Sequence, residues 1–286
     1  MKRFMFIIMS VMLVLSVLSG CSGVSAPTST PTPTSTSTST STPTPTPTPT
    51  STSTPAAQTV ELQVFAAASL TEALNEIATL YAKEAPNVKL VFNFDSSGKL
   101  QTQIENGAEA DIFLSAAEKQ MDALESYIVS TSRKDLLLNK VVLIVPEGED
   151  KGIASFDDIA TDKVSLIALG NADVPVGQYS EEIFTTLGTW DAISKKASLG
   201  SNVKEVLSQV ENGSVDCGIV YSTDAATSNG VTIIAEAPEG SHKAIVYPAA
   251  VLSASQSQEA AQAFLDYLNM PEAEKVFEKI GFEIAK

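Results

Sequence analysis

Short apolar runs alternate with segments of helical periodicity from about residue 59 to the end of the chain. Apolar residues such as Leu70, Leu74 and Ile77 recur at the spacing of one helix face. The predicted strands are Glu61–Ala67, Val88–Phe94, Asp111–Ser115, Val141–Val145, Ser165–Ala168, Cys217–Tyr221, Thr232–Ile234 and His242–Leu252, the last interrupted by Pro248. The predicted helices are Leu70–Tyr81, Leu100–Glu105, Glu118–Tyr127, Glu181–Leu187, Val203–Glu211, Gln258–Leu268 and Glu272–Ile280. This alternation predicts an α/β fold in which helices cover largely parallel sheets.

Several predicted helices begin directly after a strand or loop. These starts are Ser69, Ser97 after Asp95, Val176 after Pro175, and Val203 after Asn202. The first N–H groups of a helix have no partner within the helix and carry partial positive charge. In parallel sheets, helices begin at the carboxyl ends of the strands, which is where ligands bind. The pattern therefore predicts a site for an anion, and no lysine, arginine or histidine accompanies Ser69.

Local structure alone offers a second interpretation of the two serines. Ser69 and Glu72 form a Ser-x-x-Glu capping box, which would occupy the Ser69 hydroxyl with its own helix. Ser97 is less well explained by capping, because Leu100 stands where a capping box would have Glu or Gln. Gly98 suits a plain turn as well as it suits close approach of the backbone to a ligand.

The other candidates also have simpler explanations. Val176 and Val203 can offer only a backbone amide, and Pro175 and Asn202 are ordinary helix-entry residues. Tyr221 ends an apolar strand, so it could be a core aromatic residue with its hydroxyl at the surface.

The first 58 residues have the composition of targeting and tether segments. Two basic residues precede the apolar run Phe4–Leu18, and small residues precede Cys21, which predicts a signal peptide over residues 1–20. That run is too short for a stable membrane span. The residues before Cys21 resemble the lipobox of bacterial lipoproteins, which predicts lipidation at Cys21; ordinary signal cleavage nearby is the alternative. Residues 21–58 are nearly all Thr, Ser and Pro and predict an extended tether.

The net charge and the cysteine content exclude some classes of function. The chain carries a formal net charge of −16, which becomes −18 when the two basic residues of the signal peptide are removed. A chain this acidic does not bind nucleic acid through its charge, so we expect no nucleic-acid partner. Cys217 is the single cysteine of the predicted folded part, which excludes an intramolecular disulfide there, and its apolar surroundings predict a buried, inert thiol.

Catalytic sites find little support in the sequence. His242 is the single histidine and stands in a polar stretch typical of a surface loop. No nucleophile elbow, phosphate-binding loop, dinucleotide fingerprint or His/Cys metal cluster is present. We therefore expect a protein that is not an enzyme and that carries no cofactor.

The order of several short motifs is more specific than any one motif. Along the chain stand Val-Phe-Ala-Ala-Ala-Ser-Leu, Asp-Ser-Ser-Gly-Lys-Leu, Ala-Asp-Ile-Phe-Leu-Ser-Ala, Val-Pro-Val-Gly-Gln-Tyr and Gly-Ile-Val-Tyr-Ser-Thr-Asp-Ala. In this order the chain resembles the periplasmic molybdate-binding proteins of ABC transporters over Val60–Lys286. The resemblance implies a type II periplasmic-binding-protein fold, with two lobes of mixed, mainly parallel sheets and a ligand cleft between them. It implies a first lobe of residues 59–140 and 248–286 and a second lobe of residues 141–247.

The same resemblance implies five groups that bind the anion. They are the hydroxyls of Ser69 and Ser97, the backbone amides of Val176 and Val203, and the hydroxyl of Tyr221. Ser96 beside Ser97 leaves a one-residue ambiguity in this assignment. Asp95 departs from what an anion site favours, because a carboxylate would repel the ligand unless it points away.

A site of hydroxyl and amide donors suits molybdate or tungstate, which carry no proton at neutral pH. The resemblance therefore implies an extracytoplasmic receptor that binds molybdate or tungstate and delivers it to the membrane permease subunits of an ABC transporter. We expect a monomer at the cell membrane, anchored by lipid at Cys21.

Two other functions stay open from the sequence. A receptor for sulfate or another tetrahedral oxyanion would use the same kind of donors. A wall-associated structural lipoprotein would explain the tether and would bind no ligand.

Overall fold

The computed structural model describes residues 59–286, so the predicted signal peptide, tether and Cys21 lie outside the described residues. The strands are β1 (Val60–Ala67), β2 (Val88–Asp95), β3 (Ile112–Leu114), β4 (Lys134–Asn139), β5 (Val141–Pro146), β6 (Ile167–Gly170), β7 (Ala197–Gly200), β8 (Cys217–Tyr221), β9 (Val231–Glu236), β10 (Ile245–Val251) and β11 (Glu283–Ile284). The α-helices are α1 (Thr71–Glu84), α2 (Ser97–Glu105), α3 (Glu118–Ala123), α4 (Pro175–Thr186), α5 (Trp190–Ile193), α6 (Val203–Glu211), α7 (Ser222–Ala226), α8 (Gln258–Tyr267) and α9 (Pro271–Ile280). The 3-10 helices are η1 (Ala68–Leu70), η2 (Glu125–Tyr127), η3 (Ser130–Ser132), η4 (Asp157–Ala160) and η5 (Ser194–Lys196).

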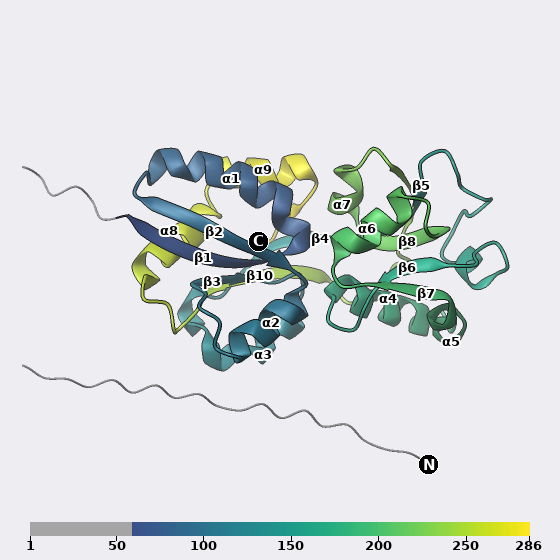
Figure 1. Cartoon of the computed structure of the whole chain (residues 1–286), viewed down its shortest axis with the longest axis horizontal. Coiled ribbons are helices and arrows are strands. Elements are labelled where there is room, and N and C mark those ends of the chain that lie inside the picture. The colour runs from purple at the N-terminus through teal and green to yellow at the C-terminus, as the bar shows by residue number, and fades with distance from the viewer. Residues whose placement is uncertain (1–58) are drawn as a thin grey trace, which may run out of the picture. The chain divides into compact units, whose positions relative to one another are not determined.

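The strands form two sheets, each with its own helices (Figure 1). The six-stranded sheet has the order β11-β4-β10-β3-β1-β2, and the five-stranded sheet has the order β7-β6-β8-β5-β9. We call the first sheet with α1, α2, α3, α8 and α9 the first lobe. The second sheet with α4, α5, α6 and α7 is the second lobe. The α/β class and the two-lobed organisation are as predicted.

Both sheets are mixed, but parallel pairs do not predominate as predicted. Of the nine strand pairings within residues 59–286, four are parallel and five are antiparallel. Each antiparallel pair contains β4, β5 or β10, the strands next to the places where the chain passes between the sheets. The alternation of strands and helices in the sequence did not reveal the direction of these strands.

The chain passes from the first lobe to the second at Lys140, between β4 and β5, and returns between β9 and β10. Strand β10 pairs with β3 and β4 along its length, from Ile245 onward. The predicted division after residue 247 therefore runs through a strand of the six-stranded sheet. The register of β10 shifts between Tyr247 and Pro248, where proline cannot donate to the ladder.

Side chains alternate between the two faces of the six-stranded sheet, as the two-residue period of a strand requires. Leu62 and Val64 of β1 belong to a core shared with α1, α8 and α9. Phe65, between Val64 and Ala66, belongs to a separate core with residues of α2 and α3 on the opposite face. Helices therefore cover both faces of this sheet, and β1 lies between β3 and the edge strand β2.

The five-stranded sheet holds α4 and α6 close to the ends of β6 and β8. Helix α6 buries Val203, Val206, Leu207 and Val210, which repeat at helical spacing. In α4, a Cβ atom at Gly177 would overlap the carbonyl oxygen of Gly170, so glycine permits α4 to pack directly on the end of β6.

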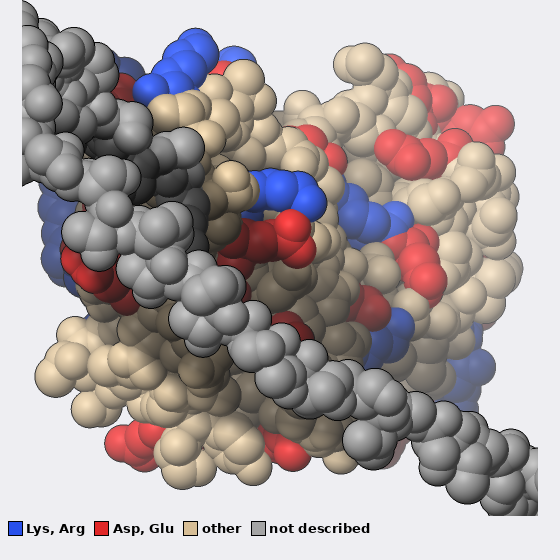
Figure 2. All heavy atoms as spheres, turned by 60° about the vertical axis from the view of Figure 1, so that its left-hand side comes forward, with Lys and Arg blue, Asp and Glu red and all other residues tan. Residues whose placement is uncertain are grey.

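Among residues 59–286, no helix is long and apolar enough to cross a membrane. Acidic and basic side chains lie beside one another on the face in Figure 2. Cys217 is buried in β8, and burial raises the pKa of its thiol to about 12. The thiol is therefore protonated at neutral pH, in agreement with the predicted inert cysteine.

Candidate functional site

A cavity of about 10 Å³ lies between the two lobes, and all five predicted binding residues line it. The lining residues are Ala67, Ala68, Ser69, Asp95, Ser96, Ser97 and Ala116 of the first lobe, and Val174, Pro175, Val176, Val203 and Tyr221 of the second. None of them is lysine, arginine or histidine. An anion in this cavity would be held by neutral donors alone.

The topology explains why these residues meet. Strands β1 and β2 run parallel to each other, and β6 runs parallel to β7 and β8. The residues that line the cavity end these strands or follow their carboxyl ends, except Ala116, which follows β3. The first turns of α2, α4 and α6 therefore line one cavity from two lobes.

Ser69 does not cap a helix, so the capping-box interpretation is wrong. It lies within η1, and α1 begins after Leu70 without a side-chain cap. The Ser69 side chain is buried, and its Oγ lies 2.9 Å from the hydroxyl oxygen of Tyr247. Glu72, the other half of the predicted box, instead forms an ion pair with Lys204.

Ser96 and Ser97 have different roles at the start of α2. Ser96 is the N-cap residue, and its side chain accepts from the backbone amide of Lys99 at 3.4 Å. Ser97 is fully buried, and its Oγ accepts from the backbone amide of Ala116 at 3.0 Å. Because a hydroxyl that accepts still has a hydrogen to donate, Ser97 can present that hydrogen to a ligand in the cavity.

Val176 and Val203 bring backbone donors from the second lobe. Val203 is the first residue of α6, after Asn202, whose side chain caps the helix by accepting from Glu205 N at 3.1 Å. Val176 is the second residue of α4, where Pro175 occupies the first position. The N–H groups at these positions have no carbonyl partner in a preceding turn, so they are available to an anion.

Tyr221 supplies the most informative group of the site. Its side chain is 1% exposed, and its hydroxyl has no hydrogen-bond partner among the described residues. A buried hydroxyl without a partner is costly, about 1–3 kcal/mol, unless something absent from the protein itself satisfies it. Burial raises the pKa of Tyr221 well above 10, so the hydroxyl keeps its proton and can donate. The surface position considered for this hydroxyl is wrong.

Asp95 lines the cavity, but its carboxylate is occupied by donors. Its Oδ1 accepts from the backbone amide of Ser96 at 2.8 Å and lies 3.3 Å from Lys99 Nζ. The amide of Asn202, from the second lobe, also donates to it at 3.4 Å. These contacts offset the repulsion that an isolated carboxylate would exert on an anion.

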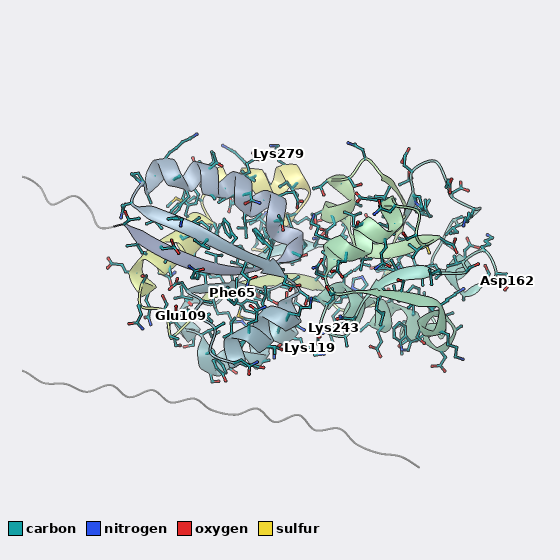
Figure 3. All side chains as sticks on the ribbon, viewed as in Figure 1. Phe65, Glu109, Lys119, Asp162, Lys243 and Lys279 are labelled. Atoms are coloured by element: carbon teal, nitrogen blue, oxygen red, sulfur yellow. The ribbon has the colours of Figure 1, made fainter. Side chains whose placement is uncertain are left out.

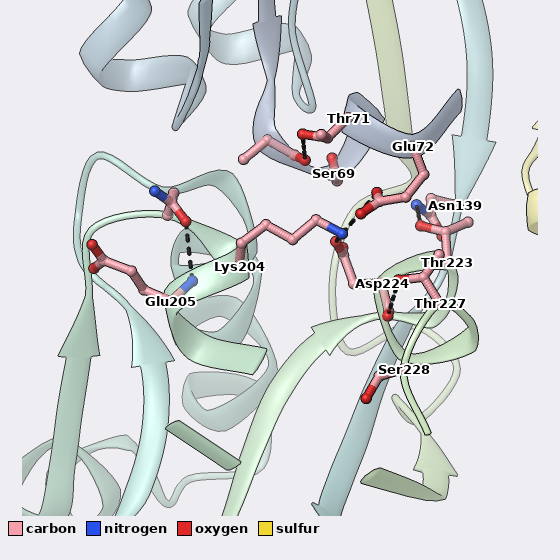
Figure 4. A network of polar contacts seen from close by, with 12 residues as sticks. Ser69, Thr71, Glu72, Asn139, Lys204, Glu205, Thr223, Asp224, Thr227 and Ser228 are labelled. Carbon is pink, nitrogen blue, oxygen red and sulfur yellow. Dashed lines mark hydrogen bonds and ion pairs between the residues drawn. The ribbon is translucent and has the colours of Figure 1, made fainter. Parts of the chain in front are cut away.

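Further contacts join the lobes around the cavity. Lys204 of α6 lies between Glu72 of α1, at 2.8 Å, and Asp224 of α7, at 3.0 Å (Figure 4). Burial alone would lower the pKa of Lys204, but the charges of Asp224 and Glu72 outweigh it and raise that pKa. The ammonium is therefore charged at neutral pH and bridges the two lobes one residue after Val203.

A larger hollow at the junction of the lobes is less suited to an anion. It has a volume of about 320 Å³ and is lined in part by Lys119 and Lys243 (Figure 3). Glu118, Asp122 and Glu182 line the same hollow, so carboxylates balance its ammonium groups. His242 lies nearby with its Nδ1 2.6 Å from the Lys243 carbonyl oxygen and does not line the cavity of the five predicted residues.

Three functional residues were not singled out from the sequence: Asn139, Lys204 and Tyr247. Tyr247 contacts Ser69 across 178 residues of chain, and Asn139 contacts Tyr247 across 108. No local spacing carries such a signal, because the pairing of β4 with β10 brings Asn139 and Tyr247 together, and Lys204 comes from α6 of the second lobe.

Residues 62–283 match the family model described as bacterial extracellular solute-binding protein. A Bacillus subtilis protein, YvgL, assigned provisionally as an ABC transporter substrate-binding lipoprotein, is 42% identical over 226 residues, which cover 78% of this chain and 86% of the relative. The Escherichia coli molybdate-binding protein ModA is 40% identical over 232 residues, covering 78% of this chain and 89% of the relative.

The solved structure of the periplasmic molybdate-binding protein of Azotobacter vinelandii has the same fold. It superimposes with a TM-score of 0.70 and 23% identity, covering 79% of this chain and all of that chain. At this identity the likeness concerns the fold alone.

Proposed function

Because the chain belongs to the family of bacterial extracellular solute-binding proteins, we propose that it captures molybdate or tungstate between its lobes for an ABC transporter. The relatives at 40% and 42% identity, one named for molybdate and one for an ABC transporter, support this assignment. The observation that carries it is the buried Tyr221 hydroxyl, which has no hydrogen-bond partner within residues 59–286 and lines a cavity with other donors.

We assign the ligand contacts to five groups. The hydroxyls of Ser69, Ser97 and Tyr221 and the amides of Val176 and Val203 each donate one hydrogen bond to the dianion. Charge-assisted bonds of this kind are each worth about 1.5–3 kcal/mol, and together they offset the dehydration of the ligand. The partial positive charges at the N-termini of α2, α4 and α6 also attract the dianion, without a cationic side chain.

The site selects against anions that carry a proton, because its five proposed groups are all donors. Phosphate keeps a proton at neutral pH, and a donor-only site would leave that proton without an acceptor, at a cost of about 1–3 kcal/mol. Molybdate and tungstate carry no proton and are satisfied by donors alone. Sulfate also carries no proton, so only the size of the cavity could separate it from molybdate and tungstate.

Closure of the lobes couples binding to delivery. Ser69 and Ser97 belong to the first lobe, whereas Val176, Val203 and Tyr221 belong to the second, so the full set of donors forms only when the lobes meet. The anion favours the closed state by these additional contacts, and the permease subunits bind that shape. The protein has no catalytic step in this cycle and acts as a monomer.

Anion titration tests the proposal directly. Molybdate and tungstate should raise the Tm of the purified protein at low salt, whereas sulfate should leave it unchanged. Stabilisation by sulfate alone would assign the protein to sulfate or another tetrahedral oxyanion. Stabilisation by none of the three would favour the wall-associated structural lipoprotein.

The proposed location rests on Cys21. We assign residues 1–20 to a signal peptide, Cys21 to the lipid anchor and residues 21–58 to the tether, with the receptor facing the extracytoplasmic side. Replacing Cys21 by alanine should release the protein from the membrane fraction. A variant that stays in that fraction would contradict the anchor.

A further inference from the structure

The Ser69 hydroxyl has one hydrogen-bond partner among the described residues, the hydroxyl of Tyr247 at 2.9 Å. Either oxygen could donate, and the choice decides what Ser69 presents to the cavity. If Ser69 donates to Tyr247, a lone pair is left for the ligand. If Tyr247 donates to Ser69, the Ser69 hydrogen is left for the ligand.

Asn139, the last residue of β4, settles the direction. Its Oδ1 accepts from the backbone amide of Lys140 at 2.8 Å and from Ser222 Oγ at 3.1 Å. A backbone N–H can only donate, so this side of the amide is the carbonyl. The Asn139 Nδ2 group therefore faces Tyr247, at 3.2 Å from its hydroxyl oxygen. The same group lies 2.9 Å from the hydroxyl oxygen of Thr223 (Figure 4).

The direction of the next bond follows. The Tyr247 oxygen accepts from Asn139, and among the described residues the acceptor at hydrogen-bond distance for its own proton is Ser69 Oγ, at 2.9 Å. Tyr247 is 1% exposed, and burial raises its pKa well above 10, so the phenol keeps that proton. Ser69 then accepts from Tyr247, and its hydrogen is free to point into the cavity that it lines.

We propose that Tyr247, oriented by Asn139, fixes Ser69 as a donor and thereby makes the site reject oxyanions that carry a proton. This inference rests on the proposed function of the site. Tyr247 does not line the cavity, so it is a positioning residue. A ligand that carries a proton needs an acceptor, and Ser69 could accept that proton only if its own hydrogen pointed to Tyr247. The hydrogen bonds from Asn139 to Tyr247 and from Tyr247 to Ser69 exclude that orientation.

Selenate and arsenate provide a matched pair for the test. They are tetrahedral and of similar size, but at neutral pH selenate carries no proton and arsenate keeps one. The ratio of their Kd values, measured by isothermal titration of the purified protein, reports the direction of the Ser69 hydroxyl. Molybdate affinity is measured beside it.

Tyr247→Phe removes the donor and frees the Ser69 hydroxyl to rotate. We expect molybdate to bind about 5- to 10-fold more weakly, and the preference for selenate over arsenate to fall at least about 3-fold. In Asn139→Asp the new carboxylate accepts the Tyr247 proton and reverses the relay, so the preference should fall further. Tyr81→Phe makes the same chemical change at a buried tyrosine that packs on Phe264 and Tyr267, and it should leave the preference unchanged.

If Tyr247→Phe loses the same affinity for selenate and for arsenate, Tyr247 contributes only packing, and the inference is overturned. A wild-type protein that prefers arsenate would overturn it too. Wild-type binding of selenate but not of molybdate would contradict the proposed function, while the change in preference would still support the relay. Binding of none of these anions would overturn both.

Discussion

The backbone amide of Gly98, in the first turn of α2, donates to the carbonyl oxygen of Asp173 in the second lobe at 3.0 Å. A Cβ atom at Gly98 would overlap that oxygen. The two lobes can therefore meet at this point because residue 98 has no side chain.

Gly98→Ala should weaken molybdate binding without loss of the fold. The methyl group opposes closure and favours the helix, so we expect an affinity at least about 10-fold lower and an unchanged or higher Tm without ligand. Isothermal titration and thermal melts measure the two effects. Gln101→Ala is the control, because Gln101 bonds within the same helix to Glu105. Equal affinity of Gly98→Ala and wild type would show that binding does not need this contact.

Tyr221→Phe separates binding from stability. The change removes a buried hydroxyl that has no partner in the described part of the chain, so the Tm without ligand should stay the same or rise. The affinity for molybdate should fall about 10-fold or more, because one donor to the dianion is lost. A parallel loss of Tm and of affinity would instead assign the hydroxyl a structural role.

Ser96→Ala and Ser97→Ala should have opposite profiles. Ser96 caps α2, so its loss should cost about 1 kcal/mol of stability, or roughly 2–4 °C of Tm, with little effect on molybdate affinity. Ser97 can present a hydrogen to the ligand, so its loss should weaken binding at least several-fold. A titration in which Ser96→Ala has the larger effect on affinity would move the assignment by one residue.

Asp224 should make stability depend on pH in an unusual direction. Burial raises its pKa from 3.8 to about 6 in spite of the opposing attraction of Lys204. The folded chain therefore binds this proton more readily than the unfolded chain. The contribution of Asp224 to stability is fully present below about pH 4 and is lost as the pH rises through about 6.

Asp224→Asn removes this titration. Its Tm relative to wild type should be higher at pH 7 than at pH 4.5, by on the order of 5 °C, because the buried charge costs the wild type stability only at the higher pH. Thermal melts of both proteins across this range measure the difference. If the difference in Tm between the two proteins does not change with pH, Asp224 does not titrate between pH 4.5 and 7, and the prediction is wrong.

The sequence predicted most of the elements that surround the site. Val203–Glu211 and Cys217–Tyr221 have the predicted bounds, because a strong helical period and a continuous apolar run mark them. Strands β4, β7 and β11 were not predicted. Strand β4 forms its ladder with β10, more than a hundred residues away in the chain, so pairing rather than local pattern decides its conformation.

The candidate site was predicted as five residues, and the structure places all five around one cavity. The interpretation of Ser69 as a cap was wrong because Tyr247, which the sequence does not connect with it, binds its hydroxyl. Motif order indicated which residues meet. It could not indicate the direction of the hydrogen bonds behind them, which depends on how Asn139 is turned.

The hydroxyl of Tyr221 has a consequence for signalling. When the lobes close on nothing, this group loses water and gains no partner, so empty closure carries a penalty of about 1–3 kcal/mol. That penalty lowers the population of the closed state without ligand roughly 5- to 150-fold, compared with a protein that has phenylalanine at position 221. The closed arrangement of the lobes would therefore form mainly when a ligand is bound.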